Sequence, residues 1–205
     1  MGLLCAVTLL TCSCASSGRN YKFENVSALK LGELDSRNYA ALFGQPDSTS
    51  MLTSKEGKYE FATYRFMEAG ANKYRFRWLS LEFKDGKLNA YAFLSSFEKD
   101  HTGVDNSKID AIRKGINKFA REDVLSLAGK PDGEAKCPTK LSEFKTHTDK
   151  ANEVWVWIAG DKINLFGSDR GKVKLSGAYV LFGDDGKVSD VQTEEYTELI
   201  WPRGF

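Results

Sequence analysis

The sequence predicts an α+β protein built as two tandem helix-helix-antiparallel-sheet repeats. Residues 34–47 align without a gap on residues 119–132, and each segment has the pattern of a short amphipathic helix stopped by glycine and followed by a proline turn. Asp85-Gly86 and Asp185-Gly186 each lie between two apolar runs, which is a signal for a tight hairpin. A long repeat of this kind indicates a chain made of two copies of one unit.

The N-terminal segment predicts a lipoprotein signal peptide over residues 1–13. It carries no charge, and its apolar run is too short to cross a bilayer. The stretch from Leu10 to Ala15 resembles the lipobox of bacterial lipoproteins, which implies that Cys14 receives the lipid, with Cys12 as the alternative. Residues 14–24 are small and polar, as in a tether. An ordinary apolar N-terminal strand or helix is the competing interpretation.

Each repeat is expected to open with two helices and to continue into strands. The first repeat covers residues 25–98, and Asp35 is a good N-cap for its second helix. The second repeat covers residues 107–198 and is enlarged by polar insertions at 136–152 and 160–171. Residues 199–205 form an apolar tail. Alternating patterns predict strands at 59–66, 74–83, 88–97, 154–158, 172–182 and 188–196.

Composition and motifs argue against several classes of function. The 29 basic and 28 acidic side chains are nearly balanced, whereas nucleic-acid binding needs a basic excess. The two histidines, His101 and His147, have no partners at metal-ligand spacing, and no phosphate loop or dinucleotide motif is present. Asp47 and Asp132 both follow Gly-x-Pro, where aspartate is common in turns. We therefore expect a protein that is not an enzyme and has no cofactor and no metal.

Aromatic residues in the predicted strands suggest a protein-binding face. If the strands are regular, Leu79, Leu81 and Phe83 face the helices, joined by Leu88, Ala90, Ala92 and Leu94, and the aromatics face the other way. Tyrosine, tryptophan and phenylalanine are common interface anchors. A bulge, packing of one sheet on the other, or cover by the insertions would bury these rings instead. The candidate binding residues are Tyr74, Phe76, Trp78, Tyr91, Phe93, Trp155 and Trp157.

A family resemblance rests on the repeated helix-turn segment. The sequence Phe119-Ala-Arg-Glu-Asp-Val124, followed by Gly129-Lys-Pro-Asp132, resembles the SmpA/OmlA (BamE-like) lipoproteins of the outer-membrane β-barrel assembly machinery. Two tandem copies resemble the β-lactamase inhibitor proteins. The resemblance implies a cell-envelope lipoprotein, lipid-anchored in the outer membrane and facing the periplasm. It would act as a non-catalytic scaffold that binds an envelope protein of unknown identity. The alternative is an inhibitor of an extracytoplasmic enzyme such as a hydrolase of the β-lactamase type.

Overall fold

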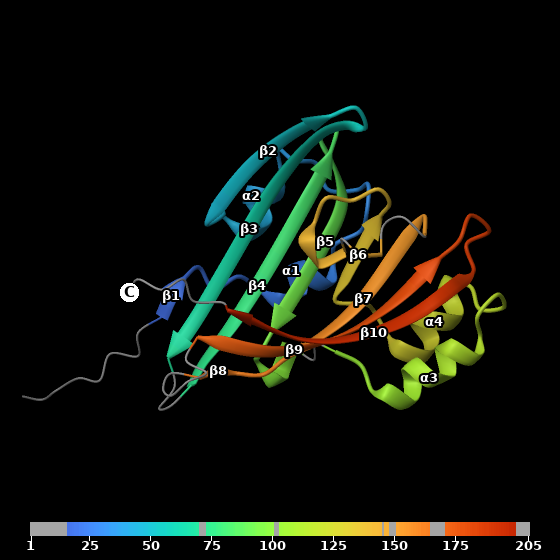
Figure 1. Cartoon of the computed structure of the whole chain (residues 1–205). Coiled ribbons are helices and arrows are strands. Elements are labelled where there is room, and N and C mark those ends of the chain that lie inside the picture. The colour runs from blue at the N-terminus through green and yellow to red at the C-terminus, as the bar shows by residue number, and fades with distance from the viewer. Residues whose placement is uncertain are drawn as a thin grey trace, which may run out of the picture.

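One ten-stranded sheet, with every strand pair antiparallel, organises the residues that the computed structural model describes. Its main path runs β1-β3-β4-β5-β6-β7-β9-β10, while β2 pairs with β3 and β8 pairs with β4 (Figure 1). The described residues are 16–69, 73–100, 103–144, 146–147, 151–164 and 171–199.

The first half of the chain contributes two very short helices and five strands. Its helices are α1 (Phe23–Ser27) and α2 (Tyr39–Phe43), and a 3-10 turn, η1 (Glu98–Asp100), ends the half. Its strands are β1 (Ser16–Gly18), β2 (Ser48–Ser54), β3 (Gly57–Ala69), β4 (Lys73–Lys84) and β5 (Lys87–Ser95).

The second half has longer helices and completes the sheet. Its helices are α3 (Asn106–Lys114) and α4 (Arg121–Ala128), and a second 3-10 turn is η2 (Ser142–Phe144). Its strands are β6 (Gly133–Lys136), β7 (Glu153–Gly160), β8 (Ile163–Asn164), β9 (Lys172–Phe182) and β10 (Val188–Leu199).

The predicted fold of two helix-helix-sheet repeats is wrong. Strand β6 pairs with β5 on one side and with β7 on the other, so the strands of both halves belong to one continuous sheet. The helices are also shorter than expected in the first half, where α1 and α2 have five residues each and no side-chain cap. Asp35, the expected N-cap, instead forms a bridge to Lys87 beside the sheet. The fold is therefore mainly an antiparallel sheet with small helical additions.

One face of the sheet carries the helices. In the first half, Val26 of α1 and Phe43 of α2 pack with Leu79, Leu81 and other buried residues. In the second half, Ile109, Ile112 and Val124 of α3 and α4 form a separate buried cluster with strands β7, β9 and β10. We call this surface the helix face.

The sheet curls toward the face opposite the helices, and we call that face the inner face. Strand β8 follows β7 in the chain but returns to pair with β4, with Tyr74 opposite Ile163. Phe76 of β4 consequently shares a cluster with Val173 and Leu175 of β9, although three strands separate β4 from β9 in the sheet. Leu141 and Phe144 of the 136–152 insertion cover the middle of this face.

Candidate protein-binding face

The seven candidate aromatic residues do not share one face. Strand β5 has an extra residue, Asn89, because Leu88 pairs with Phe83 whereas Ala90 pairs with Glu82. Such a bulge reverses the side-chain alternation beyond it. The predicted orientation of Tyr91 and Phe93, and that of Ala90, Ala92 and Leu94, is therefore wrong. Tyr91 and Phe93 lie buried on the helix face, opposite Leu81 and Leu79.

Trp155 and Trp157 also lie on the helix face, contrary to the prediction. Both are buried in the cluster formed with α3 and α4. The ring of Trp155 packs edge-on against Phe182, with centroids 4.8 Å apart, and its Nε1 donates to Glu153 at 2.6 Å. These two residues therefore serve as packing partners for the second pair of helices, and they are not accessible anchors.

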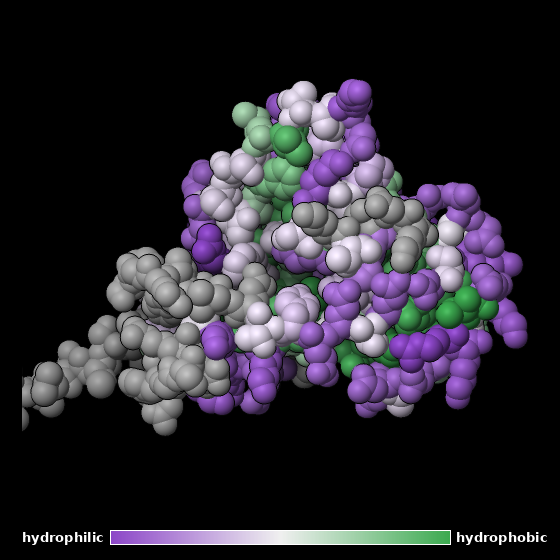
Figure 2. All heavy atoms as spheres, in the orientation of Figure 1, coloured by the Kyte–Doolittle hydropathy of each residue, from purple (hydrophilic) through white to green (hydrophobic). Residues whose placement is uncertain are grey.

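Tyr74, Phe76 and Trp78 remain on the inner face, as predicted, but only two of them reach its surface. Phe76 is buried at 1% exposure, while Tyr74 and Trp78 are half-buried and pack around it. Met67, Leu94 and Tyr196 are also half-buried against the same cluster. We call Met67, Tyr74, Trp78, Leu94 and Tyr196 the inner-face patch. In the view of Figure 2, hydrophobic atoms reach the surface in small separate areas between neutral and hydrophilic side chains.

The inner-face patch also contains hydrogen-bond donors that lack acceptors. Arg65 lies opposite Trp78 in the sheet, and its guanidinium carbon is 5.2 Å from the centre of the Trp78 ring. Nε1 of Trp78 and Nε of Arg65 are both buried without a hydrogen-bond partner among the described residues. An unsatisfied buried donor costs about 1–3 kcal/mol. Both atoms have almost no accessible surface, so an acceptor on another molecule reaches them only when the surrounding side chains shift.

Sequence reasoning missed three of the five residues of the inner-face patch, namely Met67, Leu94 and Tyr196. Leu94 was assigned to the helix face because the bulge at Asn89 has no clear sequence signal. Tyr196 pairs with Leu175 on β9, and the curl of the sheet then brings both residues next to β4. The alternation of β10 could have placed Tyr196 on a face, but not beside Trp78.

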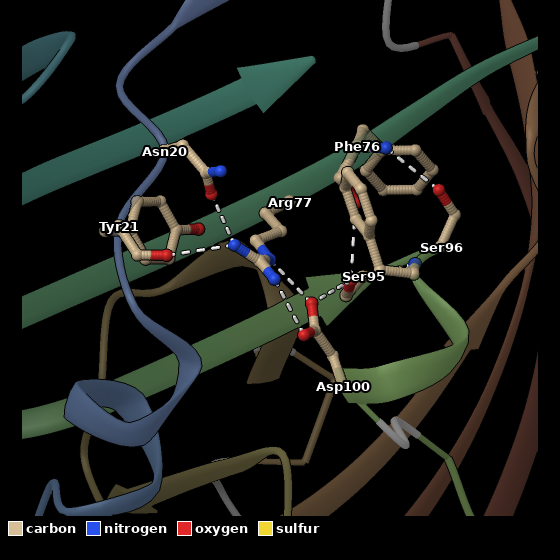
Figure 3. A network of polar contacts seen from close by, with 8 residues as sticks. Asn20, Tyr21, Phe76, Arg77, Ser95, Ser96 and Asp100 are labelled. Atoms are coloured by element: carbon tan, nitrogen blue, oxygen red, sulfur yellow. Dashed lines mark hydrogen bonds and ion pairs between the residues drawn. The ribbon is translucent and has the colours of Figure 1, made fainter. Parts of the chain in front are cut away.

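Buried charges elsewhere are paired within the protein and have structural roles. The guanidinium of Arg77 donates to Asp100 through Nε at 2.6 Å and through Nη2 at 2.8 Å, and Nη1 donates to the Tyr21 carbonyl at 2.9 Å (Figure 3). Ser95 Oγ also donates to Asp100 at 2.6 Å. This network ties the N-terminal segment to β4 and β5.

Two other buried carboxylates hold the backbone together. Glu82 accepts from Asn89 Nδ2 at 2.6 Å and from the Thr139 hydroxyl at 2.9 Å, which fixes the insertion to the bulge. Asp132 accepts from the backbone N–H groups of Gly103 and Ile158 at 2.7 and 2.8 Å. Burial raises the pKa of Asp132 to about 7, although the hydrogen bonds from Gly103 and Ile158 act in the opposite direction and lower it. Both residues are occupied by structural contacts, as predicted for Asp132 in its turn.

Several residues singled out in the sequence are not among those that the structure describes. Cys12, Cys14, His101 and residues 200–205 lie outside the described residues. Among the residues that are described, no group of three or more metal-ligating side chains is found. Within the same residues, no helix is long and apolar enough to cross a membrane.

Comparisons with known proteins give one distant structural likeness. No family model matches the chain, and no curated protein matches it. A solved structure from Streptococcus mutans, of a protein provisionally assigned as a β-lactamase inhibitor protein, aligns with a TM-score of 0.46 and 11% sequence identity. The alignment covers 83% of this chain and 93% of that one. A likeness of this degree carries no functional argument, and the SmpA/OmlA resemblance gains no support from it.

Proposed function

We propose that this chain is a non-catalytic protein-binding module of the cell envelope and that the inner-face patch is its contact surface. The observation that carries the proposal is the group of half-buried apolar and aromatic side chains around Phe76, with the Arg65 guanidinium carbon 5.2 Å from the centre of the Trp78 ring. Aromatic and arginine side chains at the centre of a contact typically dominate binding energy. The partner would pack apolar atoms against Tyr74, Trp78 and Tyr196.

A hollow beside the patch offers room for a partner side chain. It has a volume of about 510 Å³ and is bordered by Glu143, Tyr179, Glu194 and Tyr196. The Glu143 carboxylate accepts from Ser80 Oγ at 2.7 Å, so the insertion and β4 are joined at its edge. The rim is polar and the patch is apolar, which is the usual composition of a protein interface.

Location in the envelope rests on the sequence of the N-terminal segment. In this proposal Cys14 carries the lipid, and the mature chain faces the periplasm from the outer membrane. Changing Cys14→Ser should abolish fatty-acid labelling and release the protein from membranes. Labelling that survives in Cys14→Ser but is lost in Cys12→Ser would move the anchor to Cys12.

Site-specific photocrosslinking in intact cells tests the contact surface. A photoreactive amino acid at position 74 should crosslink a partner, whereas the same group at exposed Leu125 of α4 should not. Trp78→Ala and Arg65→Met should each remove the position-74 adduct, and Trp78→Phe should weaken it, because the phenyl ring keeps an aromatic surface of smaller area.

Two controls keep this experiment decisive. Thermal unfolding of each variant must match the wild type, so that loss of the adduct reports contact and not folding. The captured protein is identified by mass spectrometry, and an envelope assembly component supports the scaffold role while a hydrolase supports the inhibitor role. Adducts at position 125 with none at position 74 would place the contact on the helix face and contradict the proposal.

A further inference from the structure

The two outer edges of the sheet are built differently. Strand β10 forms one edge and carries Glu194 and Glu195, and its register with β9 shifts between Val188 and Asp190. Charges and bulges of this kind discourage pairing with another strand. Strand β2 lies at the other edge (Figure 1), and among the described residues it pairs only on its β3 side.

Strand β2 lacks every one of those protective features. Its seven residues, Ser48–Ser54, contain no charge, proline or glycine, and its register with β3 is unbroken from Ser48 to Ser54. Met51 is 72% exposed and Leu52 is 44% exposed, although both are apolar. An exposed, regular and uncharged edge strand is a ready template for pairing with another chain.

We propose that two copies of this chain associate through β2, as an antiparallel β2–β2 pair centred on Met51. The sequence of β2, Ser-Thr-Ser-Met-Leu-Thr-Ser, reads nearly the same in both directions. Antiparallel pairing about Met51 sets Ser48 opposite Ser54 and Thr49 opposite Thr53, and these like pairs are favourable across strands. A self-complementary edge of this kind fits the two-fold symmetry of a homodimer.

Charges at the ends of β2 agree with the same register. Asp47 precedes the strand and Lys55 follows it, and both are exposed. Pairing centred on Met51 places Asp47 of each copy next to Lys55 of the other, so both ends of the interface join opposite charges. A strand from an unrelated protein would not be expected to match this arrangement, which favours a second copy as the occupant.

The dimer would present both binding faces on the same side. Residues directly opposite in an antiparallel pair project from the same face of the sheet. Leu52 lies opposite Tyr59 of β3, which by alternation shares the inner face with Arg65. The two inner-face patches would then point in one direction, and the dimer could hold two partner molecules. Dimer formation itself does not depend on the proposed function, because it uses the edge and not the patch.

Analytical ultracentrifugation of the purified full chain tests the proposal. The wild type should show a concentration-dependent dimer. Thr49→Lys/Thr53→Lys places two like-charged pairs in the interface and should weaken association by at least about tenfold. Thr49→Lys/Thr53→Glu creates opposite-charged pairs in the same register and should restore it. The matched control Leu42→Lys/Leu125→Lys adds the same charge at two exposed helix positions and should leave association unchanged.

Two results would overturn the dimer. One is a wild-type chain that stays monomeric at every accessible concentration. The other is an association constant that is the same in Thr49→Lys/Thr53→Lys as in the wild type. Crosslinking at position 74 is scored separately, so loss of the dimer with retained partner adducts would reject this inference and leave the proposed binding face intact.

Discussion

The two halves of the molecule use the same backbone hydrogen bonds to join the segment before their second helix to the sheet, but they differ in the side chains that lie between helices and sheet. The Leu88 N–H donates to Leu34 O at 2.8 Å in the first half, and the Val188 N–H donates to Phe119 O at 2.9 Å in the second. Gly44 and Gly129 both end a helix with φ near +80°, a conformation that favours glycine. The recurrence is therefore local, within one continuous sheet.

The difference is clearest at one equivalent position on the helix face of each half. Counting back from the aligned residues Leu81 and Val180, Arg77 of the first half corresponds to Ser176 of the second. Arg77 fills its position and binds Asp100 and Tyr21, whereas Ser176 borders a hollow of about 420 Å³ beside α3 and Trp157. The first half therefore has a buried ion pair where the second half has a hollow. In the first half, this pair and its hydrogen bonds also fix the N-terminal segment.

The largest expected change in stability comes from removing the counter-ion of Arg77. Asp100→Ala leaves the Arg77 guanidinium buried without its counter-ion, and this should lower the free energy of unfolding by about 3–5 kcal/mol. Glu195→Ala, at the edge of the hollow in the second half, should change it by less than about 0.5 kcal/mol. Denaturant unfolding measures both.

A double variant separates charge from packing at this position. Arg77→Met/Asp100→Leu removes both charges and should be more stable than Asp100→Ala, because a buried pair replaced by apolar groups is often near neutral. If the double variant is as unstable as Asp100→Ala, the loss of stability comes from packing. The two halves would then not differ through the charges of Arg77 and Asp100.

The second prediction contrasts the two Gly-x-Pro-Asp turns. Asp47 is exposed and accepts from the Arg65 N–H, while Asp132 is buried and accepts from Gly103 and Ile158. Burial raises the pKa of Asp132 to about 7, above an unfolded value of about 3.9, so the folded state holds the proton more tightly. The stabilising contribution of that proton is present below about pH 4 and is lost as the pH rises towards 7.

Asp132→Asn should remove this dependence on pH. The amide keeps an oxygen acceptor and stays neutral, so between pH 4 and 7 the wild type should lose roughly 2–4 kcal/mol relative to the variant. Asp132→Ala removes the acceptor and should be destabilised throughout, more than Asp47→Ala at its exposed turn. Parallel unfolding curves for wild type and Asp132→Asn from pH 4 to 8 would show that Asp132 does not titrate in this range.

Sequence patterns predicted local features better than their assembly. The Asp85-Gly86 turn and the glycine stops at Gly44 and Gly129 follow from backbone conformations that few residues adopt, so sequence signals them directly. Continuity of the sheet depends on β6, a four-residue strand directly before the 136–152 insertion, which has too few residues to show alternation. Helix length in the first half was misjudged because a short apolar stretch fits a turn as well as a helix.

The candidate site shows the same limit at the level of single residues. Tyr74, Phe76 and Trp78 were placed on the correct face because β4 alternates regularly from Lys73 to Trp78. Tyr91 and Phe93 were misplaced by one extra residue, Asn89, whose amide is held by Glu82. A one-residue shift exchanges the two faces of a strand, so errors of this kind affect every residue beyond the bulge.

The smallest predicted effect concerns the ends of the helices. In the second half, the Asp105 carboxylate caps α3 by accepting from the Ser107 N–H at 2.7 Å. Hydrogen bonding to the Ser107 side chain, and then to its backbone N–H, lowers the pKa of Asp105. In the first half, Asn38 at the start of α2 makes no side-chain cap bond. Asp105→Ala should therefore cost about 1 kcal/mol, and Asn38→Ala should cost only a few tenths.

Asp105→Asn refines this prediction, because asparagine caps helices about as well as aspartate. It should restore most of the stability lost in Asp105→Ala, and the remainder measures the attraction between the carboxylate and the positive end of α3, typically about 0.3–1 kcal/mol. Thermal unfolding at low and high salt separates the two, since only the charge contribution is screened. Equal losses for Asp105→Ala and Asn38→Ala would mean that helix capping does not distinguish the halves, and that the second half owes its longer helices to the burial of Ile109 and Ile112 alone.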